Sequence, residues 1–152
     1  MSRNMNLKKL IETADLSAEA IFRATGQLLP MYHMITVKGA HIVTPSPSQD
    51  KDLAVKIMKA ALKEFNVDSY VFLSEAWSVS AKTEDIAVPR EGLRRHPDRR
   101  EIIMYSAEDR AGNQRMAHRY ILRPEHGPAT LSRLEIMAAA NMSSGRLVGL
   151  FK

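Results

Sequence analysis

Hydrophobic residues recur at helical spacing near the start of the chain and again after residue 50. Residues 7–14 and 21–29 each show this spacing, and Ser17 is a candidate cap between them. They predict one bent helix or two helices that end before Pro30. The clearest helix is predicted over residues 51–65, with one apolar stripe made of Leu53, Ala54, Ile57, Met58, Ala61 and Phe65.

Alternating and β-branched runs predict strands in the rest of the chain. Residues 31–44 predict a hairpin that turns at Lys38 and Gly39, which places His33 and His41 on opposite faces. Further strands are predicted over residues 69–80, 101–107 and 114–123. In residues 130–138 a weak alternation favours a strand, and a helix started by a capping box is the open alternative.

This order of elements predicts one α+β domain over residues 1–152. The sheet is expected to be largely antiparallel, with helices packed on one face. A polar connection over residues 81–100 interrupts the strands. Connections of that length in a compact domain are typically functional or mobile.

Composition and motifs then exclude several kinds of chemistry. The 152 residues contain no cysteine, which rules out disulfides, thiolate metal sites and a cysteine nucleophile. The five histidines lack metal-binding spacing, and no glycine-rich phosphate loop occurs, so we predict no metal and no cofactor. No apolar run is long enough to span a membrane, and the N-terminus lacks a signal-peptide core. We therefore expect a cytoplasmic protein without a membrane partner.

Positive charge is concentrated in one part of the chain. Residues 90–123 hold nine arginines and five acidic residues, which is most of the net charge of +5. Arginine suits phosphates and carboxylates, so this segment predicts an acidic partner, either nucleic acid or an acidic protein surface. The candidate binding residues are Arg94, Arg95, Arg99, Arg100, Arg115, Arg119 and Arg123. A solvated surface with local ion pairs is the alternative, and a homodimer formed through sheet edges is equally open.

Three residues are candidates for acid–base chemistry. Glu75 shares a strand face with Leu73 and Trp77, where desolvation would raise its pKa as a general acid requires. His96 is a candidate base that Asp98 would orient. Each also has a structural explanation: an ion pair for Glu75, a backbone hydrogen bond for His96 and an Asx-turn for Asp98.

Two segments together resemble a pattern in small uncharacterised bacterial and phage-borne proteins. They are VFLSEAW (71–77) and HPDRREIIMYSAEDRAG (96–112), and the pattern spans about a quarter of the chain. The resemblance implies no activity, but it favours Glu75, Trp77, His96, Asp98 and Arg99 as residues to test. The leading prediction is therefore a small non-enzymatic binding protein with an arginine-rich surface. A small hydrolase or other acid–base enzyme using Glu75, His96 and Asp98 is the alternative.

Overall fold

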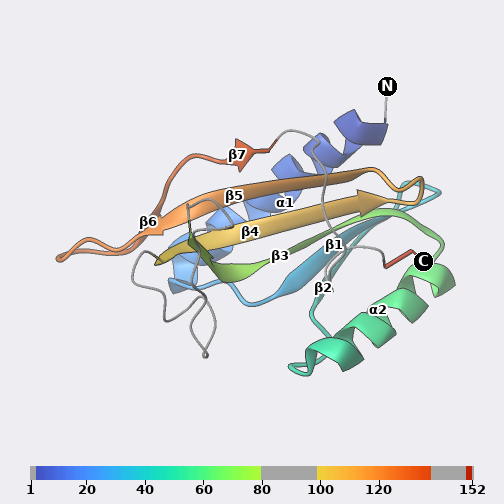
Figure 1. Ribbon diagram of the computed structural model, residues 1–152, viewed down its shortest axis with the longest axis horizontal. Helices are drawn as coiled ribbons and strands as arrows, with labels where there is room; N and C mark the ends of the chain where they lie inside the picture. The colour runs from blue at the N-terminus through green and yellow to red at the C-terminus, as the bar shows by residue number, and fades with distance from the viewer. Residues whose placement is uncertain (1–2, 80–98, 138–149, 152) are drawn as a thin grey trace.

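The computed structural model describes residues 3–79, 99–137 and 150–151, which form two helices and an open sheet (Figure 1). In chain order the elements are α1 (Arg3–Thr25), β1 (Met31–Thr36), β2 (His41–Pro45), α2 (Lys51–Glu64), β3 (Val67–Val79), β4 (Arg99–Asp109), β5 (Gln114–Leu122), β6 (Thr130–Leu131) and β7 (Glu135–Ile136). Every strand pair is antiparallel, which confirms the predicted α+β class. Neither of these helices is long and apolar enough to cross a membrane.

The sheet has the order β2-β1-β3-β4-β5, and both β6 and β7 pair with β5. β3 and β4 are the longest strands, and they pair from Ser69 opposite Asp109 to Val79 opposite Arg99. β4 therefore begins two residues earlier than predicted, so Arg99 and Arg100 belong to a strand. The remainder of the predicted connection lies outside the described residues. After residue 130 the described chain forms two short strands, β6 and β7, rather than the single strand or the helix considered from the sequence.

α1 is one continuous helix rather than two pieces. Ser17 lies exposed in its middle and caps nothing. No proline or glycine interrupts residues 3–25, and the buried positions Leu7, Leu10, Ile11, Ala14, Ala18 and Phe22 form one unbroken stripe. The helix ends at Gly26, whose φ of +78° is the left-handed conformation that glycine adopts most easily and whose N–H bonds to the Phe22 carbonyl.

The two helices cover opposite faces of the sheet, which corrects the prediction that they share one face. α1 packs with Val71 and Leu73, whereas Met58 and Leu62 of α2 pack in a second cluster with Tyr70 and Phe72. The reason lies in β3, whose first half is apolar on both faces. A strand of this kind buries its side chains only if each face of the sheet is covered.

The hairpin register also differs from the prediction, by one residue. The Thr36 N–H bonds to the Ala40 carbonyl, so the loop holds three residues, and its last one, Gly39, has a φ of +90°. His41 therefore lies opposite Ile35. A shift of one residue exchanges the faces of a strand, so His33 and His41 share a face.

α2 is confirmed, with Asp50 as its N-cap and Asn66 in the left-handed conformation just after it. Its buried stripe is narrower than predicted, because it consists of Ala54, Met58 and Leu62. Leu53 is 48% exposed and Ile57 is 40% exposed. Half of the predicted apolar stripe therefore has no cover among the described residues.

Candidate functional site

Many of the predicted functional residues meet at one end of the sheet, where β3 ends and β4 begins. The register pairs Trp77 with Glu101, and β5 places Tyr120 opposite Ile102. We call this group the sheet end, and it consists of Glu75, Trp77, Arg99, Arg100, Glu101, Tyr120 and Arg123. Because neighbouring side chains alternate, Arg100 and Tyr120 point to the face that carries α2. The others lie on the face that carries α1.

Glu75 anchors the connection between α1 and β1. Its Oε2 accepts a hydrogen bond of 2.6 Å from the backbone N–H of Leu28, a buried residue in the segment that leads from α1 into β1. This contact joins residues 47 positions apart in the chain. The structure therefore gives Glu75 a structural role through a backbone hydrogen bond, which differs from the ion pair considered in the sequence analysis, and its role as an acid stays a prediction.

Glu101 and Arg123 form a second contact on the same face. The Arg123 Nε donates a hydrogen bond of 2.5 Å to the Glu101 Oε2. This bond raises the pKa of Arg123 above its ordinary value, and burial opposes it only in part. Arg123 thus has a carboxylate partner within the chain, although its side chain remains 49% exposed.

Arg99 and Arg100 each lie over an aromatic ring, on opposite faces of the sheet. The Arg99 guanidinium carbon lies 5.2 Å from the Trp77 ring centre, and that of Arg100 lies 3.7 Å from the Tyr120 ring centre. Both arginines are exposed, and Trp77 is 39% exposed. Stacking on a ring restricts a flexible guanidinium group while leaving its charge at the surface.

Arg119 lies elsewhere, between the sheet and α1. Its side chain is 12% exposed, with the Asp15 carboxylate 3.2 Å from Nε and the Glu19 carboxylate 3.5 Å from the nearer terminal nitrogen. The Tyr105 hydroxyl also donates to Asp15, at 2.5 Å. We call these four residues the α1 seam. Burial raises the pKa of Asp15, although the bond from Tyr105 and the charge of Arg119 oppose that shift.

The predicted arginine row on β5 therefore does not form one exposed strip. Arg115, Arg119 and Arg123 share a face as the alternation predicted, but α1 packs on that face and supplies two acids to Arg119. Arg115 is half-buried, and its Nε has no hydrogen-bond partner among the described residues. Sequence alternation identified the shared face but not the helix that covers part of it.

Four predicted site residues lie outside the described residues: Arg94, Arg95, His96 and Asp98. The arrangement of Glu75 with His96 and Asp98 therefore stays a prediction. β3 and β4 pair, and their register places Glu75 and Glu101 on one face.

His33 and His41 lie close together, contrary to the prediction. His33 Nδ1 is 3.0 Å from His41 Nε2, and His33 is almost fully buried. Burial, with the charge of His41, lowers the pKa of His33 to about 4. Among residues 3–79, 99–137 and 150–151, no group of three or more His, Asp or Glu side chains is placed to hold a metal ion.

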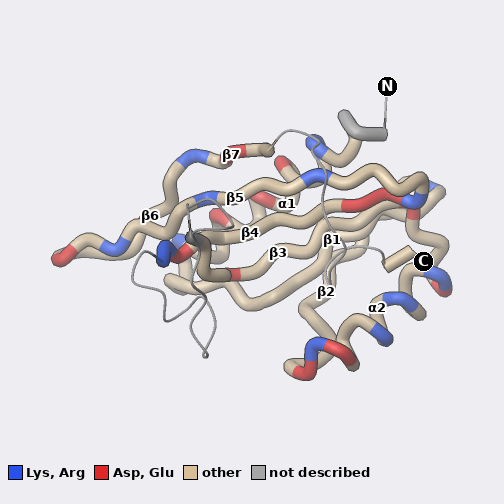
Figure 2. Tube along the Cα trace, in the orientation of Figure 1, with Lys and Arg blue, Asp and Glu red and all other residues tan. Residues whose placement is uncertain are grey.

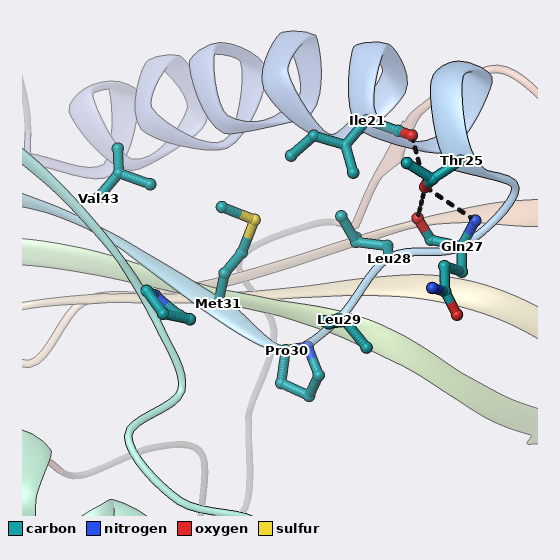
Figure 3. A pocket seen from close by; sticks show the side chains of 9 residues that line it. Ile21, Thr25, Gln27, Leu28, Leu29, Pro30, Met31 and Val43 are labelled. Carbon is teal, nitrogen blue, oxygen red and sulfur yellow. Dashed lines mark hydrogen bonds between the residues drawn. The ribbon is translucent and has the colours of Figure 1, made fainter.

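An apolar pocket of about 300 Å³ lies between the end of α1 and the hairpin (Figure 3). Its lining consists of Ile21, Thr25, Gln27, Leu28, Leu29, Pro30, Met31, Val43 and Pro45. The Thr25 hydroxyl is already bonded to the Ile21 and Gln27 carbonyls. With no carboxylate or imidazole in its lining, this pocket offers binding surface rather than acid–base groups.

Sequence reasoning missed the buried carboxylates, among them Asp15 in the α1 seam and Glu108 on the other face. Glu108 is 2% exposed and accepts hydrogen bonds from the Tyr70 hydroxyl and the Gln114 side-chain amide. The apolar neighbours of Glu108 on β4 could have indicated its burial, but only if the strand had been predicted to extend to Asp109. For Asp15, the apolar neighbours Ile11 and Ala14 on the helix were the available signal.

No family model matches the chain, and comparisons with curated proteins and with solved structures likewise give no match. The resemblance to the bacterial and phage-borne pattern stays a prediction.

Proposed function

We propose that the protein is a non-enzymatic binding protein whose sheet end binds an acidic partner, with single-stranded nucleic acid as the first candidate. The observation that carries this proposal is the pair of consecutive arginines, Arg99 and Arg100, each stacked on an aromatic ring. Arginine beside tryptophan or tyrosine is the combination that binds phosphates and stacks on bases in proteins that hold single strands. The same combination is enriched at the centres of protein interfaces.

The location of these two side chains supports the proposal. They point to opposite faces at a strand terminus, so an extended ligand that crosses the end of the sheet meets both charges. Both side chains are exposed, whereas that of Arg119 is 12% exposed and lies beside two acids of α1. Three more arginines, Arg90, Arg94 and Arg95, come shortly before Arg99 in the sequence. With Arg99 and Arg100 they make up five of the nine arginines between residues 90 and 123.

We also propose a cytoplasmic site of action. The full sequence contains no cysteine, and small secreted domains commonly depend on disulfides.

Trp77 provides a direct test, because it is the only tryptophan in the chain and lies in the proposed site. Single-stranded DNA is titrated into the full chain while tryptophan fluorescence is followed, at low and at moderate salt. We expect the fluorescence to change on binding, and the affinity to fall steeply as salt rises, because phosphate contacts release counterions. The double variant Arg99→Ala/Arg100→Ala should weaken binding by at least about tenfold.

The matched control removes two charges from α2, in Lys56→Ala/Lys59→Ala. These lysines are exposed and belong to α2, and this helix lies away from the end of the sheet where β4 begins (Figure 2). They should leave the affinity within about twofold, since charges beyond a Debye length are screened. Equal losses in the two double variants would show nonspecific attraction to a basic protein and would reject the proposed site. If DNA and heparin fail to bind at low salt but an acidic polypeptide binds through Arg99 and Arg100, the partner is a protein.

A further inference from the structure

The outer edge of β2 has no strand partner among the described residues. The backbone N–H and C=O groups on that side can therefore bond to another strand. The Thr36 N–H bonds to the Ala40 carbonyl, and the Ser46 N–H bonds to the Pro30 carbonyl. Residues of a strand alternate in direction, so even-numbered residues of the hairpin's second strand face β1. His41 and Val43 therefore point their N–H and C=O groups away from the sheet.

This edge lacks the features that usually prevent strands from pairing. The β2 sequence HIVTP carries no Lys, Arg, Asp or Glu, whereas free edges are commonly protected by such charges. Pro45 is its one protective residue, and it lies at the end of the strand. Four residues of uncharged edge remain available.

Apolar side chains lie exposed on both sides of this edge. On the α1 face, Ile21, Leu29 and Val43 line the pocket and are 37%, 69% and 51% exposed (Figure 3). On the other face, Ile42 of β2 is partly exposed and packs against the cluster that contains α2. Isolated exposed apolar residues are ordinary, but a group beside a free edge indicates an interface.

The other edge of the sheet decides which partner is favoured. β6 and β7 already pair with β5, whereas in the described part of the chain β2 has no strand on its outer side. The second half of β3, from Ser74, also lacks a strand on the side of β1, but it carries Glu75, whose side chain already bonds to Leu28. A second copy of this chain can continue the sheet by pairing β2 with β2. That contact uses the same surface twice and closes as a two-fold dimer rather than a fibre.

A second copy paired along β2 would cover the free backbone groups of His41 and Val43. It would also cover the Val43 side chain, which is 51% exposed.

We propose that two copies of this chain form a dimer by antiparallel pairing of their β2 strands, centred on Ile42. In this register His41 lies opposite Val43 of the second copy, and these residues exchange four backbone hydrogen bonds across the two-fold axis. No bond requires the N–H that Pro45 lacks. The five strands from β2 to β5 of each copy then join into one continuous sheet, with the two α2 helices on the same face.

The test is the mass of the full-length protein in solution, measured by sedimentation over a wide concentration range. A dimer is expected. Val43→Pro removes an N–H that points outward and bonds to no described residue, so it should raise the dimer dissociation constant at least about tenfold without unfolding the monomer. Val43→Thr, which keeps the N–H and the branched shape, is the matched control and should dimerise nearly as well as the parent.

Cross-linking locates the interface independently. The natural chain has no cysteine, so Ile42→Cys introduces a single thiol that the proposed register places beside its copy, within disulfide distance. Oxidation should link this variant into a covalent dimer. Leu16→Cys, on the exposed side of α1, is the matched control and should stay unlinked.

A monomer at every concentration would overturn the proposal. So would a dimer that Val43→Pro leaves intact, or one in which Ile42→Cys does not link, since each places the contact elsewhere. Binding of DNA at the sheet end is measured separately, so the failure of one proposal is distinguishable from failure of the other.

Discussion

The α1 seam and the sheet end both contain arginine, but the role of that side chain differs between the two regions. In the α1 seam, Arg119 is 12% exposed and lies beside the carboxylates of Asp15 and Glu19. At the sheet end, Arg99 and Arg100 lie on the surface over Trp77 and Tyr120. The first arginine helps to hold a helix on the sheet, and the other two present charge to the solvent.

This difference shows that the number of arginines in a segment is a weak guide to a binding surface. Arg99, Arg100 and Arg119 all belong to the segment with the highest positive charge. What separates them is the element packed above each one: α1 brings two acids to Arg119, and an aromatic ring supports each of the others. A buried ion pair is costly to break, whereas an exposed stacked arginine contributes little to stability.

The largest expected effect comes from breaking the α1 seam at Arg119. Arg119→Met should lower the free energy of unfolding by about 3 kcal/mol at pH 7, because it leaves Asp15 buried without its counter-charge. Denaturant unfolding followed by circular dichroism measures this. The double variant Arg99→Ala/Arg100→Ala is the control and should lose less than about 1 kcal/mol. Equal decreases in the free energy of unfolding would show that the arginines of the two regions contribute equally to stability.

The pH dependence of Asp15 sharpens the same comparison. Burial raises the pKa of this carboxyl in the folded state above its ordinary value of 3.8, so between the two pKa values the folded protein binds more protons than the unfolded chain. Stability from this group is therefore fully present below about pH 4 and is lost as the pH rises through the folded pKa. The parent should therefore exceed Asp15→Asn in free energy of unfolding by a larger margin at pH 4 than at pH 7. An unchanged difference between the two pH values would contradict a raised pKa.

The smallest effect is expected at Glu75, on the inner side of the sheet end. Glu75→Ala should destabilise the protein by about 1–2 kcal/mol, because the buried N–H of Leu28 loses its acceptor. Glu75→Gln keeps an acceptor oxygen and should recover most of that loss. Thermal unfolding of the two variants measures the difference. Equal stability of both variants and the parent would show that the hydrogen bond does not anchor the segment and would strengthen the acid–base prediction.

Local features of the chain were predictable where short-range rules determine them. The strands and α2 follow from their hydrophobic spacing, and Asn66 adopts the left-handed conformation that commonly follows the end of a helix. The hairpin register was wrong because a three-residue loop replaced a two-residue one. That single step exchanged the faces of β2 and brought His41 to His33.

The candidate site was predictable only in part, for a related reason. Alternation along β3 correctly placed Glu75 on one face with Leu73 and Trp77, because side-chain direction in a strand is a local property. The bond from Leu28 to Glu75 joins segments 47 residues apart, and no local pattern encodes it.

The sequence by itself determined the α+β class, the antiparallel pairing and a concentration of arginine between residues 90 and 123. These follow from residue spacing, turn chemistry and composition, which act over a few positions. Only the tertiary structure decided that the helices lie on opposite faces, that Arg119 is enclosed by α1, and that Arg99 and Arg100 stay at the surface. Those outcomes depend on which distant segment packs on each face of the sheet, because elements far apart in the chain bury one another.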